Sequence, residues 1–197
     1  MKQGFLLGLT GSIGMGKSTT AAMFAAEGIP VWDADAVVHR LYARGGAAVA
    51  PIAALFPEGV LDGAVSRPAL KTIIAGNPTA LARIEALIHP MVAADRAAFI
   101  AAADADLIVL DMPLLFENGM ETTVDATLLV TAPVALQRQR VMARPGMTEA
   151  HFATILARQM PDAEKRKRAN HIVETLEIAA TRAYVRALIT YIRGSHA

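Results

Sequence analysis

Hydrophobic residues along the chain gather in five short runs, separated by longer stretches that have helical spacing. The runs are bounded by turn-forming or charged residues and lie at 5–9, 29–32, 107–110, 128–130 and 171–173. Strands of a parallel sheet have this pattern, because helices cover both faces and no polar alternation survives. The intervening stretches are long enough for right-handed helical crossovers. The pattern predicts an α/β fold with a parallel sheet.

Two intervals are too long for a simple crossover and predict helical insertions. Residues 36–103 are divided by proline- and glycine-containing breaks, and the pattern predicts that His89-Pro90 ends one helix and begins another. Residues 135–168 form two helical pieces separated by Pro145-Gly146. Side chains that favour the helix N-cap precede three of the predicted helices: Ser66, Asn77 and Thr148.

A glycine-rich turn follows the first predicted strand and opens the first predicted helix. Residues 11–18, Gly-Ser-Ile-Gly-Met-Gly-Lys-Ser, match the phosphate-binding pattern G-x-x-x-x-G-K-[ST] in full. Unpaired N–H groups and the helix dipole favour an anion there, Lys17 supplies a charge to the β- and γ-phosphates, and Ser18 offers an oxygen ligand to Mg²⁺. The alternative is a glycine turn that binds nothing. The nucleotide-binding residues predicted from this turn are Gly11, Ser12, Ile13, Gly14, Met15, Gly16, Lys17, Ser18 and Thr19.

The absence of two sets of motifs excludes two classes of nucleotide-binding protein. The guanine-reading N-K-x-D and the D-x-x-G switch of Ras-type GTPases do not occur, and neither does the Leu-Ser-Gly-Gly-Gln signature of transporter ATPases. A small-molecule kinase fits the chain length, with a substrate domain and an arginine lid that close over two ligands and exclude water. We therefore predict a nucleotide-binding core (1–35, 104–134 and 169–197), a helical substrate domain (36–103) and a helical lid (135–168).

Three acidic residues follow predicted strands, where ligands of open α/β sheets bind. A carboxylate at Asp35 or Asp33 can accept the proton of an attacking hydroxyl, and Asp35 is the preferred candidate. The alternative is that Asp33 or Asp35 caps the helix that begins near residue 36. Asp111 ends an apolar run, and we interpret it as an acid that orients Mg²⁺ or its water shell, with a strand-end turn as the alternative.

Basic residues are concentrated in the predicted lid. Residues 137–168 carry eight basic and three acidic side chains, a net charge of +5 within a chain of net charge +1. Arg140 and Arg144, four residues apart on a predicted helix, would share a face suited to a triphosphate, and Arg158 could join them. The alternative for any charge run is a solvated face, which is our interpretation of the run 165–168. His89 is a candidate for substrate contact, although a lone histidine is more often structural.

Composition sets limits on compartment and partners. The chain has no cysteine, which excludes disulfides and thiolate chemistry and fits a reducing compartment. It has no apolar stretch of transmembrane length, and its beginning does not read as a signal peptide. The near-neutral net charge gives no overall attraction to nucleic acid or anionic lipid. We therefore expect a cytoplasmic protein with no nucleic-acid partner and no membrane contact.

The ordered set of motifs resembles the dephospho-coenzyme A kinase family over nearly the whole chain. The resemblance rests on the phosphate-binding sequence at 8–18 and on four further groups in the same order and spacing. These are Asp33-Ala34-Asp35 with His39-Arg40, His89-Pro90-Met91-Val92, Pro113-Leu114-Leu115-Phe116-Glu117, and Arg140, Arg144 and Gln159. One departure lies near the adenine position, where the family carries Ala-Asp and an Asn five residues later, and this chain has Ala169-Asn170 and Thr175.

The resemblance implies a five-stranded phosphate-loop kinase core that transfers phosphate from ATP to dephospho-CoA with Mg²⁺. It implies that Asp35 is the base for the ribose 3′-hydroxyl and that Arg140 neutralises the transferring phosphoryl group, while Asp33, His39, His89 and Arg158 are candidates for substrate contact. We expect a monomer or a weak homo-oligomer. The alternatives are another small-metabolite kinase, of the shikimate or gluconate type, and a nucleotide-dependent RNA-binding module.

Overall fold

The computed structural model describes residues 4–196 and divides the chain into two compact units. The first unit combines Met1–Trp32 with Ala103–Ala197, and the second is Asp33–Ala102. The first unit contains the sheet and the phosphate-binding turn, and the second is mainly helical. No helix within residues 4–196 is long and apolar enough to span a bilayer.

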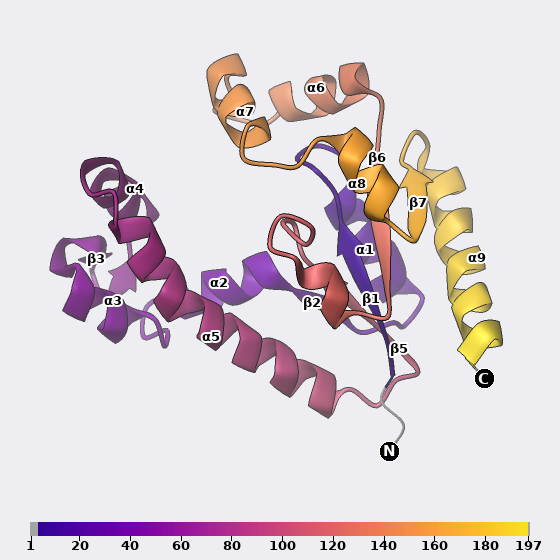
Figure 1. Cartoon of the computed structure of the whole chain (residues 1–197), viewed down its shortest axis with the longest axis horizontal. Helices are drawn as coiled ribbons and strands as arrows, with labels where there is room; N and C mark the ends of the chain where they lie inside the picture. Colours follow the sequence, from indigo (N-terminus) through magenta and orange to yellow (C-terminus); the bar gives the residue numbers. More distant parts are fainter. Residues whose placement is uncertain (1–3, 197) are drawn as a thin grey trace. The chain divides into compact units, whose positions relative to one another are not determined.

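The sheet of the first unit has five parallel strands and confirms the predicted fold class (Figure 1). All five predicted strands are present, each within a few residues of its predicted bounds. The first strand pairs with two others, in the registers Leu9 to Asp111 and Leu9 to Leu128. In spatial order the strands are β2 (Val31–Asp33), β5 (Leu107–Asp111), β1 (Phe5–Thr10), β6 (Ala126–Thr131) and β7 (His171–Glu174).

Both faces of this sheet are covered, which explains why its strands are continuously apolar. Helices α1 (Lys17–Ala26) and α9 (Ile178–His196) pack on one face, where Phe24 and Val185 are fully buried. On the other face, a side chain at Gly8 would meet Leu115 and Val124, so the segment after β5 lies directly against β1. Buried surface on both sides leaves no position for polar alternation.

Three helices lie between β6 and β7, and their bounds are α6 (Val134–Met142), α7 (Glu149–Leu156) and α8 (Asp162–Arg168). Thr148 caps α7 as predicted, because its hydroxyl accepts a hydrogen bond from the His151 amide at 3.2 Å. The prediction that Arg140 and Arg144 share a helix face is wrong. Helix α6 ends at Met142, and Arg144 lies in the exposed turn that follows.

The second unit holds a short hairpin that the sequence analysis did not predict. Strands β3 (Val60–Leu61) and β4 (Ala64–Val65) are antiparallel, and Asp62 and Gly63 join them with φ values of 51° and 76°. An Asp-Gly pair between apolar residues is the expected signal for such a turn. The remaining elements are α2 (Ala34–Tyr42), α3 (Val49–Leu55), α4 (Arg67–Gly76), α5 (Ala80–Ala102) and two 3₁₀ turns, one here at Pro57–Gly59 and one in the first unit at Met120–Thr123.

Helix α5 continues through Pro90, so the predicted break at His89-Pro90 is wrong. A proline inside a helix costs about 3 kcal/mol because it removes a backbone hydrogen bond. Buried Ile84 and Ile88, on the turns before the proline, pack into the core of the second unit. Burial of these side chains before Pro90, together with the partly buried Met91 and Val92 after it, outweighs the local penalty. Of the other predicted caps, Ser66 accepts from the Ala69 amide at 3.3 Å, whereas Asn77 makes a turn with Thr79.

Candidate active site

The phosphate-binding turn lies between β1 and α1, and its glycines are required by the backbone. Gly14 and Gly16 have φ values of 76° and 92°, which side-chain-bearing residues rarely adopt. A Cβ atom at Gly16 would lie 2.9 Å from the Thr175 hydroxyl. The first N–H groups of any helix have no partner within that helix. At the start of α1 the N-cap residue is Gly16, which has no side chain that could accept from them. The arrangement is suited to an anion.

Lys17 and Asp111 form an ion pair beside this turn. The Lys17 ammonium lies 2.5 Å from the Asp111 carboxylate, and the side chains are only 14% and 3% exposed. They meet because β1 and β5 are neighbours in the sheet, and Asp111 is the last residue of β5. Two residues that the sequence analysis assigned to ATP and to Mg²⁺ are therefore in direct contact. Ser18 and Thr19 are exposed in the first turn of α1.

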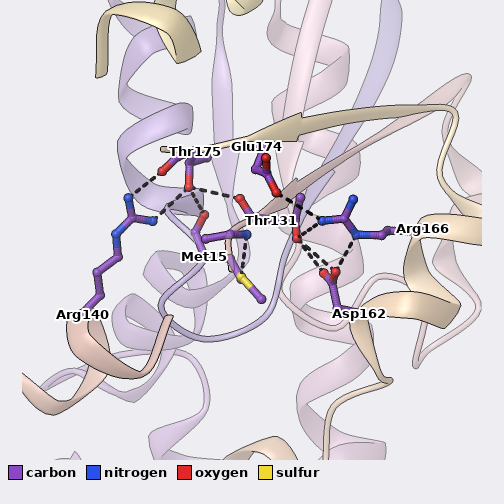
Figure 2. A network of polar contacts seen from close by, with 8 residues as sticks. Met15, Thr131, Arg140, Asp162, Arg166, Glu174 and Thr175 are labelled. Carbon is purple, nitrogen blue, oxygen red and sulfur yellow. Dashed lines mark hydrogen bonds and ion pairs between the residues drawn. The ribbon is translucent and has the colours of Figure 1, made fainter. Parts of the chain in front are cut away.

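Arg140, on α6, is held by Thr175, the residue after β7 (Figure 2). Its guanidinium donates to the Thr175 hydroxyl at 2.9 Å and to the Thr175 carbonyl at 2.5 Å. The same hydroxyl donates to the Met15 carbonyl at 2.8 Å, so one buried side chain joins the arginine to the glycine turn. Sequence reasoning noted Thr175 only as a departure from the family, and no local pattern predicts this contact.

The other departure, Asn170, has a structural task. The Asn170 side-chain oxygen accepts hydrogen bonds from the Thr127 backbone N–H and hydroxyl, both at 2.9 Å, and the Asn170 backbone N–H donates to that hydroxyl at 3.0 Å. These contacts join β6 to the residue before β7. Thr127 is 2% exposed, so the amide side chain satisfies polar groups that would otherwise be buried without partners.

Helix α8 is attached to the strands by ion pairs and hydrogen bonds. The interpretation of residues 165–168 as a solvated face is wrong for Lys165, which is buried, whereas the other three basic side chains of the run are exposed. Arg166 donates to Asp162 at 2.7 Å and to the Thr131 hydroxyl at 2.9 Å, and it lies 3.8 Å from Glu174 (Figure 2). The Lys165 side chain is fully buried, with its ammonium 2.8 Å from the Glu117 carboxylate. A buried charge needs such a partner, and the partner comes from a segment almost fifty residues earlier in the chain.

Arg168 and Glu117 extend this attachment. Arg168 pairs with Glu121 and stacks over the Phe116 ring, with its guanidinium carbon 5.3 Å from the ring centroid. Glu117 also accepts a hydrogen bond from the Met160 amide at 2.8 Å. The position of Glu117 in the sequence indicated no role for it. In the structure its carboxylate binds both Lys165 of α8 and the backbone of Met160, which lies just before α8. Arg144 and Arg158, by contrast, are exposed.

The remaining predicted site residues lie in the second unit. Asp33 caps α2, since its carboxylate accepts from the Ala36 amide at 3.0 Å. Asp35 and His39 are exposed and lie four residues apart on α2, which places them on one face of that helix. Arg40 pairs with Asp95 of α5 at 2.9 Å, and His89 is exposed on α5. The capping alternative is therefore correct for Asp33.

Comparisons with known proteins settle the family. The sequence profile described as dephospho-CoA kinase matches residues 5–179. The chain belongs to the dephospho-CoA kinase family.

Individual relatives agree with this assignment. A dephospho-CoA kinase from Cereibacter sphaeroides is 68% identical over 189 residues, which cover 96% of each chain. The crystal structure of TT1252 from Thermus thermophilus matches with a TM-score of 0.87 at 37% identity, covering 96% of this chain and 98% of that one. A dephospho-CoA kinase from Campylobacter jejuni shares the fold, with a TM-score of 0.70 at 23% identity over 96% and 98% of the two chains. The chain is a phosphotransferase of the phosphate-loop kinase fold, and ATP is its phosphoryl donor.

Proposed function

We propose that this chain transfers the γ-phosphoryl group of ATP to the ribose 3′-hydroxyl of dephospho-CoA, giving coenzyme A and ADP. The observation that carries the proposal is the Lys17–Asp111 pair, 2.5 Å apart beside a glycine turn that opens a helix. A cation, unpaired helix N–H groups and a buried carboxylate are the groups that phosphoryl transfer from a metal-bound nucleotide requires. Membership of the dephospho-CoA kinase family supports dephospho-CoA as the phosphoryl acceptor.

On the donor side, the turn and the first N–H groups of α1 bind the phosphates, and Lys17 exchanges Asp111 for the β- and γ-phosphate oxygens. The residues that we assign to this site are Gly11, Ser12, Ile13, Gly14, Met15, Gly16, Lys17, Ser18 and Thr19. Arg140 then faces the transferring group, where its charge counts most in the transition state, and Arg144 and Arg158 contact the other charged parts of the two ligands.

On the acceptor side, Asp35 takes the proton of the 3′-hydroxyl as the new P–O bond forms. The bond between the γ-phosphorus and the β-phosphate oxygen breaks, and ADP leaves with that oxygen. Asp33 is already bound to the Ala36 amide, whereas the Asp35 carboxylate is exposed. That difference favours Asp35 as the base, while Asp33 acts on substrate only through the helix that it caps. His39 and His89 contact dephospho-CoA in this proposal.

Mg²⁺ fits the donor set of this site. Ser18 offers a hydroxyl and Asp111 a carboxylate, and Mg²⁺ prefers a few oxygen ligands from protein together with phosphate oxygens and water. Asp111 already lies against a cation, which shows that its surroundings accept positive charge beside it. When bound, Mg²⁺ neutralises charge on the β- and γ-phosphates. Ser18 would bind the ion, and Asp111 would hold it directly or through water.

The test is ADP release from Mg-ATP with a panel of alcohols. Dephospho-CoA should support turnover, whereas coenzyme A, whose 3′-position is already phosphorylated, should not, and neither should shikimate or gluconate. Turnover with shikimate or gluconate but not dephospho-CoA would refute the proposal. Lys17→Ala should retain less than about a tenth of wild-type turnover, because a charge facing the phosphates in a dry site contributes several kcal/mol.

A second pair of variants tests the base. Asp35→Asn should remove most of the turnover and leave ATP affinity nearly unchanged, as expected for a group that acts on the acceptor. Asp33→Asn should be milder and should lower the melting temperature slightly, because asparagine caps a helix about as well as aspartate but loses the negative charge that favours the start of α2. The opposite order of the two effects on turnover would transfer the role of base to Asp33.

A further inference from the structure

Two glutamines from opposite ends of one segment bind the backbone of the same phosphate-loop residue. The segment, which we call the α6–α7 segment, comprises residues 134–159. Near its start, the Gln137 side-chain amide donates to the Ile13 carbonyl at 2.8 Å. At its end, the Gln159 side-chain oxygen accepts from the Ile13 amide at 3.1 Å. Both polar groups of one backbone position are therefore held by this segment.

Burial makes the first of these bonds consequential. Gln137 is 4% exposed, although it lies on a helix whose neighbouring residues Arg138 and Gln139 are exposed. A buried amide without a partner costs free energy, so its position depends on the Ile13 carbonyl. Nothing in the local sequence distinguishes Gln137 from Gln139, and only the folded structure separates them.

Gly14 lets helix α6 come this close to the loop. A Cβ atom there would lie 2.5 Å from a Val141 methyl carbon and 3.0 Å from the Gln137 carbonyl oxygen. Val141 is fully buried. Glycine is therefore required at position 14 for two reasons. It adopts the positive φ angle, and it leaves room for α6 to pack on the loop with Gln137 within reach of Ile13.

We infer that Gln137 and Gln159 are positioning residues for the phosphate loop, which couple the placement of the α6–α7 segment to ATP binding. Holding Ile13 from both sides keeps the neighbouring N–H groups of the loop in the arrangement that receives phosphate. Preorganised donors bind an anion without the cost of ordering them. The coupling is reciprocal, so bound ATP stabilises the attachment of the segment. This inference rests on the proposed function, since it takes ATP to be the ligand of the loop.

The first test compares Gln137→Met with Gln139→Met on the same helix. Gln137→Met removes the donor and leaves the Ile13 carbonyl unpaired, so the Kd for ATP should rise about tenfold, the expected scale for one buried hydrogen bond. The KM for dephospho-CoA should stay within about twofold. The exposed control, Gln139→Met, should leave both constants unchanged. A purely structural role for Gln137 would lower the melting temperature and the active fraction without changing the Kd for ATP, and that result would overturn the inference.

The direction of the two bonds provides a second, charge-matched test. Gln159 accepts, so Gln159→Glu keeps its hydrogen bond to the Ile13 amide. Gln137 donates, so Gln137→Glu loses its bond and places a carboxylate against a carbonyl oxygen. Both variants add the same charge near the nucleotide, so the difference between them reports the lost hydrogen bond at Gln137 together with the repulsion between the new carboxylate and the Ile13 carbonyl. Gln137→Glu should weaken ATP binding at least fivefold more than Gln159→Glu does, and equal effects would contradict the inference.

A double variant tests whether the two glutamines act on one element. If each bond holds the same loop residue, releasing either one frees it, and Gln137→Met with Gln159→Met should weaken ATP binding by less than the product of the single effects. ATP affinity is measured by calorimetry without an acceptor, which keeps this question separate from the substrate assignment. A wild-type protein that binds no ATP would refute the proposed function. A wild-type protein that binds ATP, with single effects that multiply fully, would refute only the joint action inferred here.

Discussion

The α6–α7 segment and helix α8 lie next to each other in the sequence and are both rich in basic residues. They differ in how many of these charges are paired with acidic side chains. Each of the four basic side chains of α8 has an acidic partner in the structure. The pairs are Lys165–Glu117, Arg166–Asp162, Lys167–Glu164 and Arg168–Glu121. In the α6–α7 segment Arg138 pairs with Glu149, but Arg140 is held by the neutral Thr175, and Arg144 and Arg158 are exposed.

This difference shows that a net charge counted along a sequence does not say which charges are available to a ligand. The +5 of residues 137–168 divides into an anchored part and an available part. Two carboxylates of α8 itself and two from the segment after β5 already neutralise the basic side chains of α8, so a phosphate gains little there. Within residues 4–196, Arg140, Arg144 and Arg158 of the α6–α7 segment form no ion pair, and arginine binds phosphate oxygens through two N–H groups at once. We therefore expect α8 to serve stability and the α6–α7 segment to serve catalysis.

The largest expected effect is on stability, from Lys165→Met. This change leaves the Glu117 carboxylate buried without its cation, and breaking such a pair typically costs about 3–5 kcal/mol. Chemical denaturation should show a loss of that order, while the KM for ATP of the folded protein stays unchanged. Lys167→Met, in an exposed pair with Glu164, is the matched control and should cost under about 1 kcal/mol.

A second change to the same pair separates charge from packing. Glu117→Gln in the Lys165→Met background should recover part of the lost stability, because a neutral amide oxygen still accepts from the Met160 amide. If the double variant is less stable than Lys165→Met alone, the pair does not act through its buried charge.

The next effect is on turnover, from Arg140→Ala. An arginine that faces the transferring group interacts most strongly with the transition state, so kcat should fall at least about a hundredfold and the KM for ATP by much less. Arg166→Ala, which removes the same kind of side chain from α8, should change kcat only a few-fold. Steady-state kinetics with dephospho-CoA measure kcat for both variants. Similar losses of kcat would contradict the expectation that the α6–α7 segment serves catalysis and α8 serves stability.

Thr175→Val should have a smaller effect in the same direction. The variant keeps the shape of the side chain but removes the hydroxyl that accepts from Arg140 and donates to the Met15 carbonyl. Since the Thr175 carbonyl still binds the guanidinium, we expect kcat to fall about tenfold, the scale of one or two hydrogen bonds. Thr175→Ser restores the hydroxyl and should recover most of the turnover. A valine variant with wild-type kcat would mean that the hydroxyl does not orient Arg140.

The smallest expected effect is on the pH dependence of the melting temperature, and it comes from His171 in the first unit. Burial lowers the pKa of His171, on β7, whose ring lies edge-on to Tyr191 with centroids 5.9 Å apart. A lowered pKa in the folded state means that the unfolded chain binds the proton more readily. The stability that His171 contributes is therefore complete above its ordinary pKa and is lost as the pH falls toward the folded value. Melting temperatures between pH 8 and pH 5 should fall less for His171→Gln than for the wild type.

The sequence by itself predicted the five strands, the phosphate-binding turn and the family, for reasons that are local. A strand buried on both faces must be apolar along its length, and a turn that needs positive φ angles and close approach to a ligand must contain glycine. Lys17 could be predicted from the motif in the turn between β1 and α1, and Asp111 from its place at the end of an apolar run. The hairpin at Asp62-Gly63 could also have been predicted, because an Asp-Gly pair between apolar residues is a local turn signal, but the sequence analysis did not predict it.

Only the tertiary structure decided what holds the other charged and polar groups. Pro90 remains inside a helix because burial of Ile84 and Ile88 outweighs a local rule, and Asp33 rather than Asp35 caps α2. The partners of Lys165, Arg140 and Gln137 lie 48, 35 and 124 residues away in the chain, at positions that the fold brings together. Hydrogen bonds and ion pairs over such separations leave no periodicity in the sequence, because each partner alone is an ordinary side chain or backbone group on a helix or a loop.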